Sequence, residues 1–298
     1  WLLKKNGLYE KIPDKPLNHL DSAIIYIEQF NNTVDWELGL IHKALKKYKI
    51  PLILLKGAAY VHANNDAANG RLFTDIDILV PKIELDAVEK MLGWYGWIDE
   101  QKEGYDREYY HRWMHELPPK YHARRGSVLD VHHNIIAETS ALSIDVGKLL
   151  QSAVKVTGTK YWVLAPEDMV LHSASHLFLN GEFENGLRDL TDIDLLLRQF
   201  SKETPNFFER LAMRSRELSL QLPLFYALYF CQRILDCPLP DEPIQQVSRY
   251  GLGRVKNVFM NFLFMRALMP NHPSCDGHWT GFARWILYIR AHYLRMPM

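Results

Sequence analysis

Two stretches of the sequence decide the fold: Leu54-Leu-Lys-Gly57, and Arg71-Leu-Phe-Thr-Asp-Ile-Asp-Ile-Leu-Val80. Residues 51–56 form a short apolar run between a proline and a glycine, which predicts a buried strand. Residues 74–80 predict a second strand, which a following proline ends. Side chains two residues apart on a strand share a face, so we expect Asp75 and Asp77 to project together while apolar neighbours pack behind them.

The paired carboxylates of Asp75 and Asp77 predict a metal site. Two carboxylates side by side repel each other unless a cation lies between them, and hard oxygen ligands suit Mg²⁺, which also binds substrate phosphates. A third carboxylate, that of Asp130, stands alone in the apolar stretch 128–135, which predicts another strand. Three carboxylates can hold two divalent ions, Mg²⁺ or Mn²⁺, about 3.5–4 Å apart, an arrangement that enzymes use for in-line displacement at phosphorus.

The rest of the chain predicts an α+β fold in two parts. In the first part a small mixed sheet is flanked by helices, expected over residues 23–30, 36–48, 58–65 and 83–94. From Pro166 onward the pattern is helical, with helices expected over residues 167–179, 187–200, 207–218, 222–235, 255–269 and 281–294. We therefore expect an α/β domain over residues 1–160, followed by an α-helical domain over residues 161–298.

Length and composition narrow the class of protein. The chain has 298 residues, and its 35 Lys and Arg balance 35 Asp and Glu. General nucleic-acid coat proteins are usually basic, so no DNA partner is expected. The 3 cysteines form no Cys-x-x-Cys motif, which argues against a disulfide framework and favours a reducing cytoplasm. The longest apolar stretches have about a dozen residues, fewer than the roughly 20 that a membrane span needs.

A glycine at a strand end, a helix, Asp-x-Asp on the next strand and a later single Asp together resemble the polymerase-beta-type nucleotidyltransferase superfamily. The likeness is greatest to a bacterial group of uncharacterised nucleotidyltransferases with three motifs, which here are Lys56-Gly57, Arg71 and Asp75-Ile-Asp77. The resemblance covers most of the chain, and its specific part is confined to residues 54–80 and 128–133. It implies transfer of a nucleoside monophosphate from a nucleoside triphosphate such as ATP to a hydroxyl acceptor, with release of pyrophosphate.

The same resemblance implies a role for each matching residue. The metal ligands and catalytic residues would be Asp75, Asp77 and Asp130. Among them, Asp130 would help to deprotonate the acceptor hydroxyl. Gly57 would let backbone N–H groups approach the triphosphate, while Lys56 and Arg71 would offset its negative charge. The acceptor itself, whether a small molecule, a protein side chain or an RNA end, is not implied.

The chain departs from the superfamily pattern in two respects. Ala58 stands where a serine usually contacts a phosphate, and 17 residues separate Gly57 from Asp75, more than in the minimal motif. Both departures concern the geometry of the phosphates more than the binding of metal.

A near-copy of the motif shows that Asp-x-Asp alone is weak evidence. The stretch Thr191-Asp-Ile-Asp-Leu-Leu-Leu197 nearly repeats residues 74–80, but leucines around it recur at helical spacing. Residues two apart on a helix point about 200° apart, because each residue turns by about 100°. We therefore expect Asp192 and Asp194 to diverge and not to share a metal ion.

Other interpretations stay open at this point. His172 and His176 share a face of an expected helix. They could be core or cleft histidines bonded to carboxylates of the next helix, or with Asp189 or Asp192 they could form the metal centre of a phosphohydrolase. Alternatively, His176 and Arg188 would contact the nucleotide or the acceptor. The chain could also be a degenerate nucleotide-binding module that acts by docking a partner. The aromatic and basic string 105–113 is typical of an antiparallel strand pair, although such strings also stack RNA bases.

Overall fold

We describe the chain from a computed structural model, which defines residues 1–48, 50–99, 114–140, 142–241, 246, 249, 251 and 253–296. The expected strand pair at residues 105–113 lies outside these residues. The chain divides into two compact units. The sheet unit comprises Trp1–Gln101, Pro118–Val131 and Lys155–Val163, and the helical unit comprises Lys102–Leu117, His132–Val154 and Leu164–Met298. Each unit is thus built from several segments, and the domain boundary expected at residue 160 stays a prediction.

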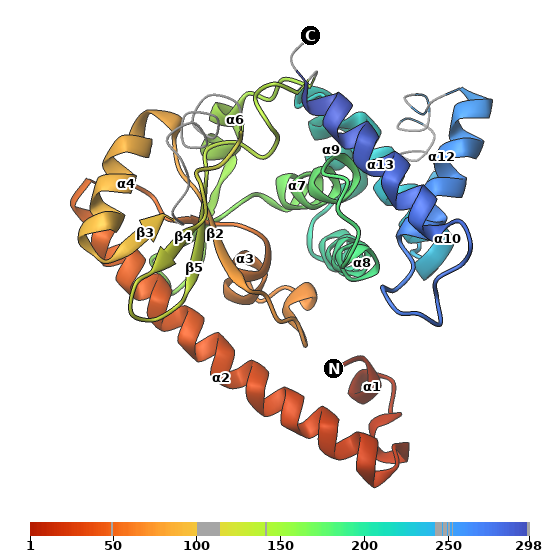
Figure 1. Ribbon diagram of the computed structural model, residues 1–298, viewed down its shortest axis with the longest axis horizontal. Helices are drawn as coiled ribbons and strands as arrows, with labels where there is room; N and C mark the ends of the chain where they lie inside the picture. The colour runs from red at the N-terminus through yellow and green to blue at the C-terminus, as the bar shows by residue number, and fades with distance from the viewer. Residues whose placement is uncertain are drawn as a thin grey trace. The chain divides into compact units, whose positions relative to one another are not determined.

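A mixed sheet organises the sheet unit (Figure 1). Within the described residues its order is β3-β4-β5-β2-β1-β7-β6. The strands are β1 (Ile53–Leu54), β2 (Asp75–Leu79), β3 (Trp97–Asp99), β4 (Lys120–His122), β5 (Val128–His132), β6 (Val154–Lys155) and β7 (Trp162–Val163). Strand β1 is antiparallel to β2 and parallel to β7, while β4 is antiparallel to both β3 and β5. The sheet confirms the α+β class, and it places β2 directly beside β5.

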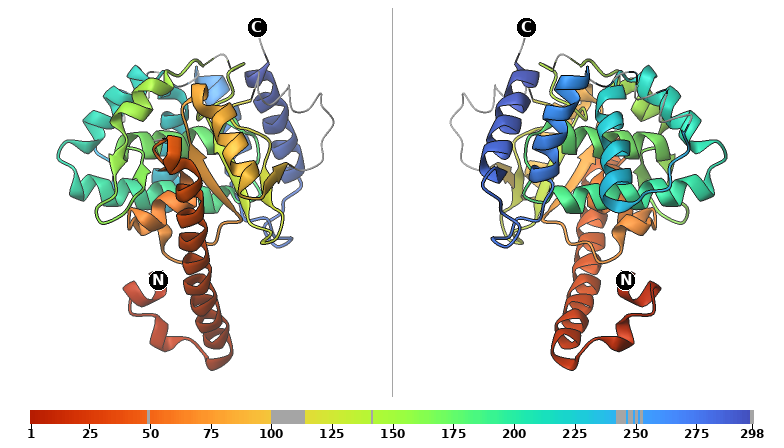
Figure 2. Two further views of the ribbon diagram at one scale, coloured as in Figure 1. Left: turned by 90° about the vertical axis from the view of Figure 1, so that its left-hand side faces the viewer. Right: turned by 90° about the vertical axis from the view of Figure 1, so that its right-hand side faces the viewer.

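The first long helix differs from the expectation. The two helices predicted over residues 23–30 and 36–48 are one continuous helix, α2 (Asp14–Leu45). Its middle is polar, but no residue there is Pro or Gly, and Thr33 Oγ1 donates a hydrogen bond (3.0 Å) to the carbonyl of Gln29 within the helix. The buried positions begin only at Val34, and this second half packs against α4. The first half is exposed and extends away from the sheet (Figure 2).

The remaining helices of the sheet unit are short. They are α1 (Leu2–Lys5), α3 (Lys56–His62) and α4 (Leu85–Trp94), with 3-10 turns at Tyr9–Lys11, Lys46–Tyr48, Asp66–Ala68 and Lys82–Glu84. Strand β1 is shorter than the predicted run 51–56, because Lys56 already begins α3. The expected helix over residues 83–94 is confirmed as α4, preceded by one 3-10 turn.

The helical unit agrees with the sequence pattern to within three residues at each expected helix end. Its helices are α6 (Val146–Ser152), α7 (Pro166–Leu179), α8 (Gly186–Glu203), α9 (Phe207–Glu217), α10 (Gln221–Leu235), α12 (Arg254–Ala267) and α13 (Thr280–Arg295). Helix α7 packs against α8, α9 and α10, and α12 packs against α13. Phe178 of α7 forms an edge contact with Phe264 of α12, with ring centroids 5.1 Å apart. In the part of the chain that is described, no helix is both long and apolar enough to cross a membrane.

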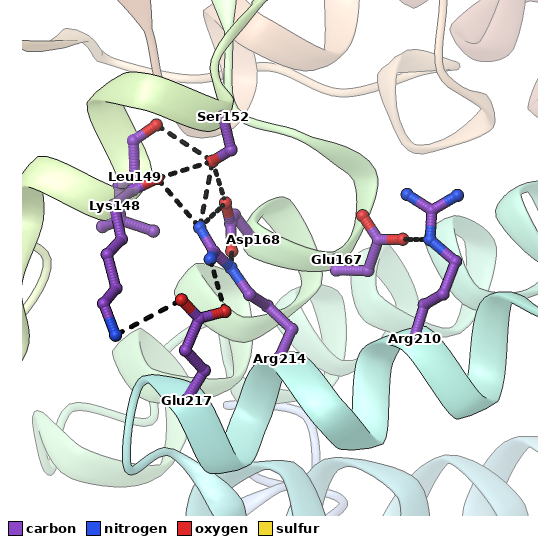
Figure 3. A network of polar contacts seen from close by, with 8 residues as sticks. All are labelled: Lys148, Leu149, Ser152, Glu167, Asp168, Arg210, Arg214 and Glu217. Atoms are coloured by element: carbon purple, nitrogen blue, oxygen red, sulfur yellow. Dashed lines mark hydrogen bonds and ion pairs between the residues drawn. The ribbon is translucent and has the colours of Figure 1, made fainter.

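One buried ion pair ties α6, α7 and α9 together inside the helical unit (Figure 3). Asp168, which is fully buried, accepts two hydrogen bonds from Arg214, from Nε at 2.6 Å and from Nη2 at 2.8 Å. Arg214 Nη2 also donates to the carbonyl of Lys148 (2.9 Å) and to Ser152 Oγ (3.0 Å). Hydrogen bonding to Asp168 raises the pKa of Arg214 above its ordinary value, so the guanidinium stays charged in this buried position.

Candidate functional site

The structure brings three carboxylates together on the sheet. Asp75 and Asp77 lie on β2 and Asp130 lies on the neighbouring β5, and one oxygen atom from each lies within 4.8 Å of the others. Asp77 is only 3% exposed, whereas Asp75 and Asp130 are partly exposed. Between the two aspartates, Ile76 packs in the core, as the alternation of a strand requires. The strand reading of residues 74–80 is therefore confirmed, and its two carboxylates converge with the third.

Lys56 provides a positive charge inside this carboxylate group. Its Nζ lies 2.7 Å from Asp77 Oδ1, and both side chains are largely buried. The backbone of Lys56 has a positive φ of 43°, which costs a residue with a side chain about 1–3 kcal/mol. The neighbouring Leu55 N–H donates to the carbonyl of Asp77 (2.9 Å), so α3 begins directly against β2. This strained start of the helix directs the ammonium group onto Asp77.

The donor set fits a hard divalent cation. All three groups offer carboxylate oxygen, which Mg²⁺ prefers, and two of them are partly open to solvent, where substrate phosphates and water could complete the coordination. The Lys56 ammonium already shows that a cation is accommodated against Asp77. Asp75 also accepts a hydrogen bond from Thr74 Oγ1 (3.0 Å), which orients its carboxylate.

Replacement of Lys56 by methionine distinguishes the effect of the Lys56 ammonium group on stability from that of a bound Mg²⁺ ion. We expect Lys56→Met to lower the free energy of unfolding by about 3 kcal/mol without metal, because the buried Asp77 carboxylate loses its ammonium counter-charge. Excess Mg²⁺ should recover much of this loss. Urea unfolding with a chelator and with Mg²⁺ measures both values. The matched control is Lys120→Met, which removes a buried lysine from Glu89 and Asp99 elsewhere in the unit. If Mg²⁺ restores stability in neither variant, or restores it equally in both, the assignment of a metal site at Asp77 is contradicted.

Gly57 packs against an aromatic ring. A Cβ at this buried position would lie 2.6 Å from the ring of Phe73, which itself makes an edge contact with Phe30 at a centroid distance of 4.9 Å. The start of α3 therefore needs a glycine for close packing. The role in triphosphate binding that the family resemblance implies for Gly57 stays a prediction beside this structural one.

Alanine at position 57 is expected to destabilise the protein by about 1–2 kcal/mol. Overpacking costs about 1–3 kcal/mol, and the better helix propensity of alanine offsets part of it. Gly93→Ala in α4 is the control, because nothing lies within 4 Å of its added Cβ, and it should leave stability unchanged or raised. Urea unfolding of both variants and of Gly57→Ala/Phe73→Ala checks the contact. A stabilised Gly57→Ala protein would refute it.

Arg71, for which a phosphate contact is predicted, lies in the segment before β2. The Arg71 guanidinium lies over the ring of Tyr60, 5.3 Å from its centroid, so its predicted contact with phosphate stays a prediction. A cavity of about 190 Å³ in the sheet unit is lined by residues 73–76, by the turn 125–128, and by Phe30, Thr33, Val34 and Glu37 of α2. It borders Asp75, and it is smaller than the pockets that hold drug-sized ligands.

His172 and His176 do not assemble the metal centre of the phosphohydrolase hypothesis. Among the described residues, the groups with donor atoms within 4.8 Å of one another include neither His172 and His176 nor Asp189 and Asp192. Asp189 instead pairs with its neighbour Arg188 at 3.0 Å. The phosphohydrolase hypothesis thus has no metal-binding geometry in this part of the structure.

The near-copy of the motif is helical, as expected. Asp192 and Asp194 lie in the middle of α8. Asp194 pairs with Arg198 one turn later, with Nε at 2.8 Å from Oδ1.

The structure also groups residues that the sequence patterns missed. His115, Glu116 and His132 place one donor atom each within 4.8 Å of the others. The sequence pattern that could have drawn attention to His132 is its position two residues after Asp130 on the same strand. Nothing in the local pattern connects residues 115 and 116 with residue 132.

Residues 2–236 match the model of a family described as uncharacterised nucleotidyltransferases. No curated protein matches the chain. Among solved structures, the antibiotic-resistance factor ANT(2'')-Ia is similar with a TM-score of 0.43 and 15% identity, over 64% of this chain and 96% of that one. The family match covers well over half of the chain, and the protein therefore belongs to this family of uncharacterised nucleotidyltransferases.

Proposed function

We propose that the protein is a Mg²⁺-dependent nucleotidyltransferase that moves a nucleoside monophosphate from a nucleoside triphosphate to a hydroxyl acceptor. The observation that carries the proposal is the convergence of Asp75, Asp77 and Asp130 on adjacent strands of a chain that belongs to a nucleotidyltransferase family. An oxygen-only donor set beside a buried lysine is suited to binding both divalent cations and phosphates.

The chain's own residues would divide the work. Asp75 and Asp77 would hold the cation that the triphosphate also binds, and Asp130 would share a second ion and accept hydrogen bonding from the acceptor hydroxyl. When bound, Mg²⁺ supplies charge neutralisation and lowers the pKa of that hydroxyl. Lys56, which pairs with Asp77, would offset the negative charge of a phosphate oxygen. This division of roles attributes catalysis mainly to positioning and to electrostatic stabilisation.

The reaction balances without a redox partner. The acceptor oxygen forms a bond to the α-phosphorus, and the bond from that phosphorus to the bridging oxygen breaks. The acceptor proton passes toward Asp130 or water, and pyrophosphate leaves. The cavity beside Asp75 has room for a group of about the size of one sugar ring, so it is the place where we expect part of a substrate to bind.

The test follows the α-phosphate. The full chain is incubated with each α-labelled triphosphate, Mg²⁺ and one class of acceptor at a time: small metabolites, protein or RNA. We expect label to enter one class, with one pyrophosphate released per transfer and none after Mg²⁺ is chelated. Pyrophosphate release that is unchanged by chelation would contradict the metal-dependent mechanism. Absence of transfer to all three classes would contradict the proposed activity.

A further inference from the structure

A second group of potential ligands lies within the helical unit and is formed by His115, Glu116 and His132. Glu116 and His132 face each other in an isolated antiparallel bridge. The N–H of His133 donates to the carbonyl of His115 at 2.8 Å, which fixes the neighbouring residue as well. Backbone pairing therefore places His115, Glu116 and His132 together.

The spacing of the donor atoms resembles that of metal ligands. Glu116 Oε2 lies 3.3 Å from His132 Nδ1 and 3.9 Å from His115 Nε2. Ligands about 2.0–2.1 Å from a tetrahedral zinc ion lie about 3.4 Å from one another. Charge-assisted hydrogen bonds are shorter, at about 2.7–2.9 Å. The cluster is thus spaced more like the edges of a coordination tetrahedron than like a closed histidine–carboxylate pair.

Burial and donor chemistry favour a particular class of ion. His132 is 1% exposed and His115 is 8% exposed, whereas the Glu116 side chain is 24% exposed and so leaves the group open on one side. Two imidazoles and one carboxylate are a common ligand set of zinc sites that keep a fourth position for water or substrate. Imidazole nitrogen favours Zn²⁺ and its neighbours over Mg²⁺, which prefers oxygen.

We propose that His115, Glu116 and His132 form a binding site for a transition-metal ion of the Zn²⁺ class, with one coordination position left to water or a ligand. The site does not depend on the proposed transfer reaction. Its donors differ from the three aspartates, so the two sites are separable by the metal that each selects.

The test uses Zn²⁺ alone on the full chain, after any affinity tag has been removed. Calorimetric titration should show one Zn²⁺ per chain at this site, both in the wild type and in Asp77→Asn. His132→Gln and Glu116→Gln should each weaken that binding by at least about 100-fold, since even partners of metal ligands contribute 10–100-fold. Co²⁺ should give a visible absorption band in the wild type that both variants lose.

The matched control is His133→Gln. His133 is equally buried and adjacent in sequence, but its Nδ1 lies 3.6 Å from Glu138, outside the cluster. This variant should retain Zn²⁺. Circular dichroism checks that all variants fold. If His132→Gln does not fold, Glu116→Gln alone tests the site, because the Glu116 side chain is partly exposed and its replacement disturbs packing less. Zn²⁺ binding that Asp77→Asn abolishes and Glu116→Gln leaves intact would overturn the proposal, as would absence of binding to the wild type.

Discussion

Asparagine at position 77 is expected to lower Mg²⁺-dependent pyrophosphate release by about 10²–10³-fold. The substitution keeps the size of the side chain but removes the charge that would hold the cation, and loss of one preorganised charge-stabilising group typically costs about 10²–10³-fold. The rate is measured with the acceptor class that takes up label. We expect the loss to persist at saturating triphosphate, because the cation acts on the chemical step as well as on binding.

Asp189→Asn is the control for this prediction. Asp189 belongs to the helical unit, carries the same charge and pairs only with the exposed Arg188 among the contacts described. It is also the carboxylate on which a phosphohydrolase centre would depend. Normal release in Asp189→Asn together with loss in Asp77→Asn supports the sheet site, and the opposite pattern contradicts it.

Methionine at position 214 is expected to destabilise the helical unit by about 3–5 kcal/mol. Arg214→Met leaves Asp168 fully buried without its guanidinium partner, and breaking a buried pair from one side has this magnitude. It also withdraws a donor from Ser152 and from the carbonyl of Lys148 (Figure 3). Urea unfolding followed by circular dichroism measures the effect.

Two further variants identify the cause. Lys148→Met removes an exposed lysine from the exposed Glu217 and should change stability by less than about 1 kcal/mol. Asp168→Leu/Arg214→Met replaces the whole pair by apolar groups and should recover much of the loss, since the buried charge is then gone. If the double variant is as unstable as the sum of its single variants, packing rather than charge explains the effect.

Much of the fold was predictable because periodicity is a local property. The apolar alternation of residues 74–80 and the helical spacing from Pro166 onward each define an element from a few neighbouring residues. The same reasoning distinguished the two Asp-Ile-Asp copies, one on β2 and one in α8. Asp130 could be anticipated because it is a single acid in an apolar strand.

What could not be predicted depends on partners far apart in the chain. Asp168 and Arg214 are 46 residues apart, and neither stands out in its own helix. The positive φ of Lys56 arises where α3 begins directly after β1, which no local pattern indicates. Gly57 is needed beside Phe73 only because α3 lies against the segment before β2. Helix α2 is also continuous through residues 31–33, where the weak helix propensity of the sequence suggests a break.

The most direct test of the central claim is a thermal-shift titration of the wild type and Asp77→Asn with ATP, GTP, CTP and UTP, each with and without Mg²⁺. A triphosphate at 100 times its dissociation constant should stabilise the wild type by roughly 2.7 kcal/mol. Only ligand-induced shifts are compared, because removing one of three neighbouring carboxylates changes the melting temperature by itself. We predict that at least one triphosphate stabilises the wild type only with Mg²⁺ and does not stabilise Asp77→Asn. Equal shifts in both proteins, or no shift in the wild type, would contradict nucleotide binding at Asp75, Asp77 and Asp130.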